Sequence, residues 1–268
     1  MSSKESDYSS TPSYFNNCEY FNKYLGRTSY YTALQDALCI AMSRIKPEKV
    51  IELGCALGTT AFALADKFPE SEIYGLDMRE DVVSKTNRMQ ESRDFSGRDN
   101  AFFVCADMTR FVQTEELSGY DFIYMLYSFH HILDPMENKI QFLEDAYRNM
   151  KEGAYLWIGE TFLPENKLTI KELWLMRAKE GYASTFWNCL KDNKGISLKR
   201  AKEAAAFSHN EEYKAGEHVS GRDNEYLVTF PWTVNAVQNA GFEVVISEPV
   251  NALGDNVILA KKTSAESQ

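Results

Sequence analysis

The segment at residues 50–60, Val-Ile-Glu-Leu-Gly-Cys-Ala-Leu-Gly-Thr-Thr, constrains the fold of this chain more than any other. A short apolar strand runs into a turn with small residues at alternate positions, Gly54, Ala56 and Gly58, and then into a helical stretch over 60–67. Small residues let the backbone of a turn approach a ligand closely, and the following helix begins with unpaired N–H groups. The segment therefore predicts a strand–turn–helix unit that binds a nucleotide cofactor.

The order of the small residues separates two kinds of nucleotide cofactor. The dinucleotide fingerprint has glycine at its first, third and sixth positions. Counted from Gly54, the third position is Ala56 and the sixth is Thr59, so most of the fingerprint is missing. Glu52, two positions before Gly54, would also repel a pyrophosphate, whereas it would attract an amino group or a sulfonium. A nicotinamide-dependent oxidoreductase is therefore a disfavoured alternative.

Beyond this unit, apolar strands and helical stretches alternate. Strands are expected at 50–53, 72–76, 101–105, 122–126, 154–158, 242–246 and 256–260. Helices are expected at 29–44, 60–68, 80–91, 136–150 and 231–240, with further helical stretches at 169–190 and 197–206. This order predicts an α/β fold, a Rossmann-like sheet of seven mostly parallel strands with helices on both faces, whose last two strands pair antiparallel. Ligands of such sheets bind outside the carboxyl ends of the strands.

Acidic residues mark three of these strands at that edge. Besides Glu52, Asp77 ends the second strand and lies 19 residues after the glycine-rich turn, close to the spacing at which a carboxylate meets a ribose diol. Asp107 ends the third strand, where it can accept a hydrogen bond from the exocyclic amine of adenine. Met78 and Met108, which follow the two aspartates, could sandwich the purine ring. Either aspartate alone could cap a helix instead, but three acids on successive strand ends favour a shared ligand.

Two of these segments resemble a known family. Residues 52–58 resemble motif I of the class I S-adenosylmethionine (SAM) dependent methyltransferases, with Ala56 in place of a glycine. Ser-Phe-His-His-Ile-Leu-Asp-Pro at 128–135 resembles the HHxxDP segment of the small-molecule group of that family, which includes ubiquinone/menaquinone, sterol and natural-product enzymes.

Two shorter segments support the same resemblance. Residues 147–154 resemble the R-x-L-K-P-G-G turn of the group, with Glu and Ala replacing the last Pro and Gly, and 240–242 resemble its AGF segment. The resemblance covers 47–158 and 229–261, which is more than half of the chain.

The resemblance implies SAM as the cofactor, S-adenosylhomocysteine as its product and no metal ion. It also implies that residues at the strand ends bind the cofactor, namely Glu52, Gly54, Gly58, Asp77, Met78, Asp107, Met108 and Tyr127. The expected reaction is methyl transfer to a small-molecule acceptor, an aromatic or amine-bearing metabolite. One alternative is a protein with the same fold and cofactor that does not methylate, and another is a pure interaction protein that binds no nucleotide.

The same resemblance suggests two catalytic residues. His131 is the candidate base, because phosphoethanolamine methyltransferases carry a histidine at the corresponding place and an imidazole can take up a proton near neutral pH. Glu160, expected just past the fifth strand, would orient His131 or bind a substrate amine. His130 would then be structural or touch the substrate. In the alternative interpretation the two histidines only close the loop, and Glu160 is a solvated charge.

The two regions without resemblance are expected to cover the acceptor pocket. The domain organisation is a disordered tail at 1–13, an N-terminal helical lid segment at 14–46, a methyltransferase core at 47–163 and 226–263, and a helical cap insertion at 164–225. Tyr24, Arg27 and Trp174 are the substrate candidates from these regions, and Arg27 would face the carboxylate of the cofactor. Such aromatic residues can equally be part of the core.

Composition narrows the partners. The net charge of −10 argues against nucleic acid, which requires a basic surface, and no apolar run is long enough to span a membrane. The five cysteines are scattered and odd in number, which favours free thiols in a cytoplasmic protein over a disulfide framework or a zinc site.

Overall fold

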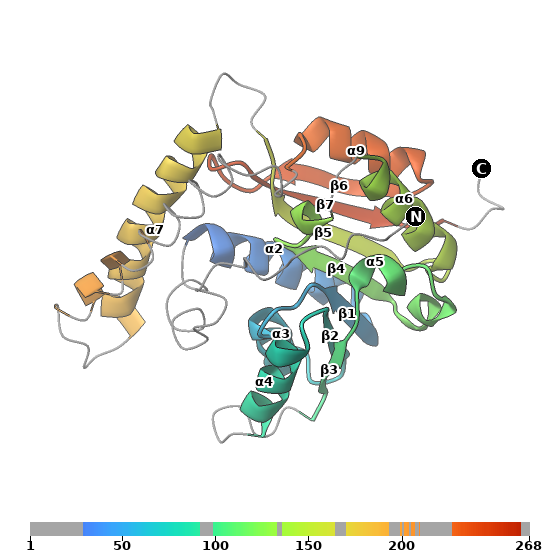
Figure 1. Cartoon of the computed structure of the whole chain (residues 1–268), viewed down its shortest axis with the longest axis horizontal. Helices are drawn as coiled ribbons and strands as arrows, with labels where there is room; N and C mark the ends of the chain where they lie inside the picture. Colours follow the sequence, from blue (N-terminus) through green and yellow to red (C-terminus); the bar gives the residue numbers. More distant parts are fainter. Residues whose placement is uncertain are drawn as a thin grey trace, which may run out of the picture.

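The computed structural model describes residues 29–91, 99–132, 136–163, 170–192 and 227–263, together with a few residues between 199 and 209. Figure 1 shows a central sheet flanked by helices, with the long helix α7 standing to one side. In the described parts of the chain, none of the helices has the length and apolarity that crossing a membrane requires.

Seven strands form one sheet in the order β3-β2-β1-β4-β5-β7-β6. Their bounds are β1 Lys49–Leu53, β2 Glu72–Asp77, β3 Ala101–Cys105, β4 Phe122–Leu126, β5 Tyr155–Thr161, β6 Glu243–Pro249 and β7 Asp255–Lys261. The first five strands are parallel to one another, and β7 is antiparallel to both β5 and β6. The predicted fold is confirmed, including the antiparallel pairing of the last two strands.

Seven helices and two 3₁₀ turns connect the strands in the described chain. The helices are α2 Ser29–Ile45, α3 Thr59–Lys67, α4 Glu80–Gln90, α5 Met108–Phe111, α6 Met136–Asn149, α7 Ile170–Asp192 and α9 Phe230–Asn239. The 3₁₀ turns are η4 Glu115–Gly119 and η5 Phe129–His131. Because β1 lies between β2 and β4, the chain leaves the middle of the sheet in opposite directions, and a crevice is expected there at the carboxyl ends of the strands.

Alternating strand residues build a core on each face of the sheet. Ile51 of β1 belongs to the cluster that includes Phe142 of α6, whereas its neighbour Val50 belongs to the cluster that includes Leu38 of α2 and Phe62 of α3. Figure 1 shows the corresponding layers, with α6 and α9 on one side of the sheet and α2 and α3 on the other. Both faces of the central strands are therefore buried, which fixes their carboxyl ends as the accessible part of the sheet.

Helix α7 lies within the predicted cap insertion and is held to the core by polar contacts, one buried and one exposed. Nη1 of Arg177 lies 2.6 Å from Oδ1 of Asp255, at the start of β7, and Thr161 donates a hydrogen bond of 2.7 Å to the same oxygen. Ser29 of α2 donates to Glu180 of α7 over 2.6 Å. The rest of 164–226 lies largely outside the described residues, as does 1–28, so the predicted lid and cap boundaries stay predictions.

Candidate active site

The turn between β1 and α3 requires small residues because of its backbone conformation. Gly54, Ala56 and Gly58 have φ angles of 83°, 45° and 67°, all in the left-handed region. The two glycines are also closely packed, because an added Cβ would lie 2.7 Å from Cβ of Ser128 at Gly54 and 2.4 Å from the ring of Phe103 at Gly58. The alternating pattern of small residues therefore reflects three left-handed positions in one turn, and Ala56 occupies its position with some strain.

Glu52 is a buried carboxyl group at the edge of the sheet. It is 3% exposed and accepts a hydrogen bond of 2.9 Å from the hydroxyl of Tyr124, its direct neighbour on β4. Burial raises the pKa of Glu52 to about 8, the hydrogen bond from Tyr124 opposes this shift, and the charge of Asp77 adds to it. In the ligand-free protein, Glu52 is therefore largely neutral at pH 7, and a cationic ligand would favour its ionised form.

Asp77 joins the end of β2 to the glycine-rich turn. Its Oδ2 accepts a hydrogen bond of 3.0 Å from the backbone N–H of Ala56, and its Oδ1 accepts one of 3.0 Å from that of Arg79. Burial raises the pKa of Asp77, while these two backbone hydrogen bonds oppose the shift. Since a carboxylate has about four lone-pair sites, two of them stay available for a diol.

Asp107 is both a helix cap and a candidate ligand of adenine. It is the N-cap of α5, and its Oδ1 accepts hydrogen bonds from the backbone N–H and the hydroxyl of Thr109 at 2.8 and 2.7 Å. Both bonds use the same oxygen, so the capping role leaves Oδ2 for another donor. The capping interpretation and the binding interpretation are therefore compatible at this residue.

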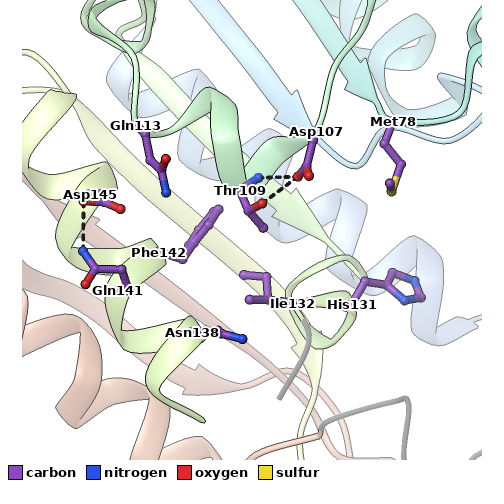
Figure 2. Close-up of a pocket in the computed structure, with 10 residues that line it drawn as sticks. All are labelled: Met78, Asp107, Thr109, Gln113, His131, Ile132, Asn138, Gln141, Phe142 and Asp145. Carbon is purple, nitrogen blue, oxygen red and sulfur yellow. Dashed lines mark hydrogen bonds between the residues drawn. The ribbon is translucent and has the colours of Figure 1, made fainter. Parts of the chain in front are cut away.

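A cavity of about 330 Å³ lies beside Asp107. Figure 2 shows the side chains around it, which come from the segments after β2, β3 and β4, from α5 and the residues that follow it, and from α6. They are Met78, Asp107, Thr109, Gln113, His131, Ile132, Asn138, Gln141, Phe142 and Asp145. Met78 is 43% exposed and lines this cavity, whereas Met108 is partly buried against the core, and the sandwich of adenine between the two methionines stays a prediction.

The two adjacent histidines have different surroundings. His130, not His131, contacts Glu160: its Nδ1 lies 2.9 Å from Oε2 of the carboxylate, and its backbone N–H donates to the same oxygen over 3.2 Å. The prediction that Glu160 orients His131 is therefore wrong, because Glu160 contacts His130 instead. The reason is that β5 continues to Thr161, which places Glu160 inside the strand and 1% exposed, rather than past its end as a solvated charge.

His131 lines the cavity and is the more exposed of the two. Desolvation, the neighbouring His130 and the ammonium of Lys139 lower the pKa of His131 well below its usual value. A neutral imidazole is therefore expected beside Met78 and Asp107, on the side of the site assigned to adenine.

Tyr127 follows β4 with a left-handed backbone, at a φ of 53°. Its backbone N–H donates to Gly159 over 2.9 Å, and its ring stacks on Tyr31 at 5.6 Å between centroids. A non-glycine residue in this conformation at a strand end is typical of functional sites.

An aromatic cage surrounds a cation of the chain itself. The guanidinium of Arg177 lies 4.2 Å from the ring centroid of Tyr30, 4.8 Å from that of Trp174 and 5.4 Å from that of Tyr127. The predicted substrate candidate Trp174 therefore contacts Arg177, and the other two candidates, Tyr24 and Arg27, lie outside the described residues.

Some residues of the site could have been found from the sequence. Asn138, Gln141 and Asp145 follow one another at helical spacing, so the sequence alone indicates a polar face on α6. Tyr124 stands in an apolar strand at the register of Glu52, and a polar partner for a buried acid was a reasonable expectation. The contact between Arg177 and Asp255 joins residues far apart in the chain, and no local pattern indicates it.

This arrangement is typical of α/β proteins that bind a nucleotide-like cofactor at the carboxyl ends of the sheet strands. The described residues contain no cluster of three or more potential metal ligands. Residues 51–156 match the model of the methyltransferase domain family.

Individual relatives agree with the family match. A carboxy-S-adenosyl-L-methionine synthase from Campylobacter hominis is 23% identical over 210 residues, which are 77% of this chain and 74% of the relative. Among solved structures, a SAM-dependent methyltransferase from Aquifex aeolicus has a TM-score of 0.53 at 16% identity and covers 93% of this chain and 97% of its own. The structure of PigF with S-adenosylhomocysteine has a TM-score of 0.53 at 14% identity over 87% of this chain, which spans 64% of PigF. Residues 51–156 therefore match a methyltransferase domain, and the fold of the chain is that of solved SAM-dependent methyltransferases.

Proposed function

We propose that this protein transfers a methyl group from SAM to a small molecule whose accepting atom, a hydroxyl oxygen or an amine nitrogen, carries a proton. The observation that supports this proposal best is the contact between Glu160 and His130 at the carboxyl ends of β5 and β4. A carboxylate that accepts the proton of Nδ1 leaves Nε2 as the basic nitrogen of the neutral imidazole. A positioned base is useful only when the nucleophile has a proton to lose.

The residues of the strand ends fit SAM. The carboxyl group of Glu52 suits the amino group, the remaining lone pairs of Asp77 suit the ribose diol, and Oδ2 of Asp107 suits the exocyclic amine of adenine. Gly54 and Gly58 let the backbone of the turn approach the ligand closely. These assignments support the cofactor-binding set proposed from the sequence.

SAM supplies a methyl group bonded to a positively charged sulfur. As the nucleophile bonds to the methyl carbon, the bond between carbon and sulfur breaks, its electron pair stays on sulfur, and the proton of the nucleophile goes to Nε2 of His130. Glu160 then stabilises the imidazolium, because its carboxylate is held by the backbone N–H groups of His130 and Thr161 at 3.2 and 2.8 Å. The base proposed here is His130, in place of His131.

The acceptor is proposed to be an aromatic or amine-bearing metabolite. The cage of Tyr30, Trp174 and Tyr127 already surrounds Arg177, so it does not support a cationic acceptor bound in that cage. A hydroxyl or amine on a planar ring fits the base better, since loss of a proton increases its nucleophilicity.

The test is the release of S-adenosylhomocysteine from SAM with a panel of phenols, catechols and aromatic amines. For an acceptor that is turned over, His130→Ala is expected to lower kcat by roughly 10²- to 10⁴-fold. His131→Ala serves as the neighbouring control and is expected to retain most of kcat. Full activity of His130→Ala would remove the base from the mechanism, and failure of every acceptor despite tight SAM binding would favour the non-methylating alternative.

A further inference from the structure

Lys139 is a buried cation beside the two histidines. It lies in the first turns of α6 and is 1% exposed. The ammonium donates a hydrogen bond to the carbonyl of Ile132 and lies 5.5 Å from the ring centroid of Phe129. These contacts lie on either side of the histidines, which occupy positions 130 and 131 between Phe129 and Ile132.

Opposite charges act on the two ends of the histidine pair. The imidazole rings of His130 and His131 are 4.0 Å apart between centroids, close enough for one charge to disfavour a second. The carboxylate of Glu160 contacts His130 at 2.9 Å and favours its protonated form. Desolvation, a proton on His130 and the ammonium of Lys139 all act on His131 in the opposite sense and lower its pKa.

Two other carboxylates among the described residues lie near His131. Asp107 and Asp145 line the same cavity. Oδ1 of Asp145 is 2.6 Å from Nη1 of Arg148 and accepts a hydrogen bond from Gln141, while Oδ1 of Asp107 is bonded by Thr109. Both carboxylates are thus directed to donors of their own, whereas Glu160 is in direct contact with His130.

We propose that Lys139 is a positioning residue that holds the loop at 128–132. Through its charge it also favours protonation of His130 over His131, so that His131 stays neutral on the adenine side of the site. This inference rests on the proposed function, because it assigns the proton of the acceptor to one member of the pair. It also explains why two adjacent histidines can take separate roles, since two imidazolium rings at this distance would repel each other.

The order in which the histidines titrate tests this proposal without any acceptor. The full chain labelled with ¹⁵N-histidine contains four histidines, and the imidazole signals of the pair are assigned with His130→Gln and His131→Gln. In the wild type, His130 is expected to take up a proton at a higher pH than His131. In Lys139→Met, His131 is expected to titrate at a higher pH than in the wild type, whereas Lys139→Arg keeps the wild-type order.

The control is Lys199→Met, which removes a lysine whose side chain is 85% exposed. It should leave the titration of both histidines unchanged. Protonation of His131 before His130 in the wild type would overturn the proposal, as would an unchanged titration of His131 in folded Lys139→Met. If Lys139→Met does not fold, Lys139→Gln makes the same test with a neutral side chain that retains a donor for the carbonyl of Ile132. Because no step requires turnover, absence of methyl transfer would refute the proposed function and leave this result standing.

Discussion

Nδ1 of His130 lies 2.9 Å from the buried carboxylate of Glu160, whereas the adjacent His131 lines the cavity next to Asp107. The two rings, 4.0 Å apart, therefore belong to different halves of the site. One faces the strand end at which an acceptor would lose its proton, and the other faces the side assigned to adenine. Under the proposed function, this division would let one short loop serve the reaction and the cofactor together.

Glu160→Gln should impair turnover without weakening the binding of the cofactor. The amide would present either an oxygen or an NH₂ group to Nδ1 of His130, and the NH₂ form favours the wrong imidazole tautomer. We expect kcat to fall by about tenfold or more while the Kd of S-adenosylhomocysteine changes little. Steady-state kinetics and calorimetric titration of the same preparation measure both quantities. Glu248→Gln, at an exposed position of β6, is the matched control, and equal losses in the two variants would contradict a special role of Glu160.

Binding of S-adenosylhomocysteine should release a proton from Glu52. The pKa of Glu52 is raised to about 8, so at pH 7 the ligand-free carboxyl group is mostly protonated, and the ammonium group of the ligand favours its ionised form. Titrations at pH 7 in buffers of different ionisation enthalpy are expected to show release of nearly one proton, and affinity should rise with pH between about 6 and 7.5. Glu52→Gln should abolish the proton release. A buffer-independent binding enthalpy in the wild type would show that Glu52 is already ionised.

The raised pKa of Glu52 also determines how its contribution to stability changes with pH. Because the native state holds a proton that the unfolded chain loses above its pKa of 4.5, the contribution of Glu52 to stability is lost as pH rises toward about 8. Glu52→Gln is therefore expected to be more stable than the wild type at pH 8, by ~2–4 kcal/mol, and about equally stable near pH 4. Urea unfolding at the two pH values measures the difference, and a variant that is less stable at pH 8 would contradict the assigned direction.

Gly58→Ala should destabilise the turn after β1. The substitution places a Cβ 2.4 Å from the ring of Phe103 at a φ of 67°, so the aromatic ring must move. We expect a loss of about 1–3 kcal/mol in the free energy of unfolding. Ala56→Gly is the matched change in the same turn. It relieves a left-handed alanine, at a φ of 45°, and should stay within about 1 kcal/mol of the wild type. Equal stability of both variants would show that the turn is not constrained as described.

Separating Arg177 from Asp255 should loosen α7 from the core. The side chains are 3% and 0% exposed, so removing one leaves a buried charge without its partner. Arg177→Met is expected to lower the free energy of unfolding by about 3–5 kcal/mol, and the double variant with Asp255→Asn should recover part of the loss. Denaturant unfolding of the two single variants and the double variant measures their coupling. Strictly additive effects would show that the two residues do not act as a pair.

The sequence carried most of the fold because the information is local. Apolar strands separated by helices predicted every strand of the sheet to within a few residues, and the left-handed turn was visible as Gly54, Ala56 and Gly58. The assignment of the histidines could not be made in this way. Which of two neighbouring rings faces Glu160 depends on the 3₁₀ turn at 129–131 and on the length of β5, and a shift of one residue reverses the answer. The burial of Lys139 is similarly hidden, because a lysine in a helix is usually solvated.

The most direct test of the central claim is calorimetric titration of S-adenosylhomocysteine, SAM and NADH into the wild type and Asp77→Ala. Asp81→Ala, at an exposed residue of α4, is the control. We expect S-adenosylhomocysteine to bind to the wild type and to Asp81→Ala alike, with affinity lowered roughly 10- to 100-fold in Asp77→Ala, and NADH not to bind. Absence of binding by both adenosylated ligands to folded wild type, or equal affinity in Asp77→Ala, would contradict the site described at the carboxyl ends of β1, β2 and β3.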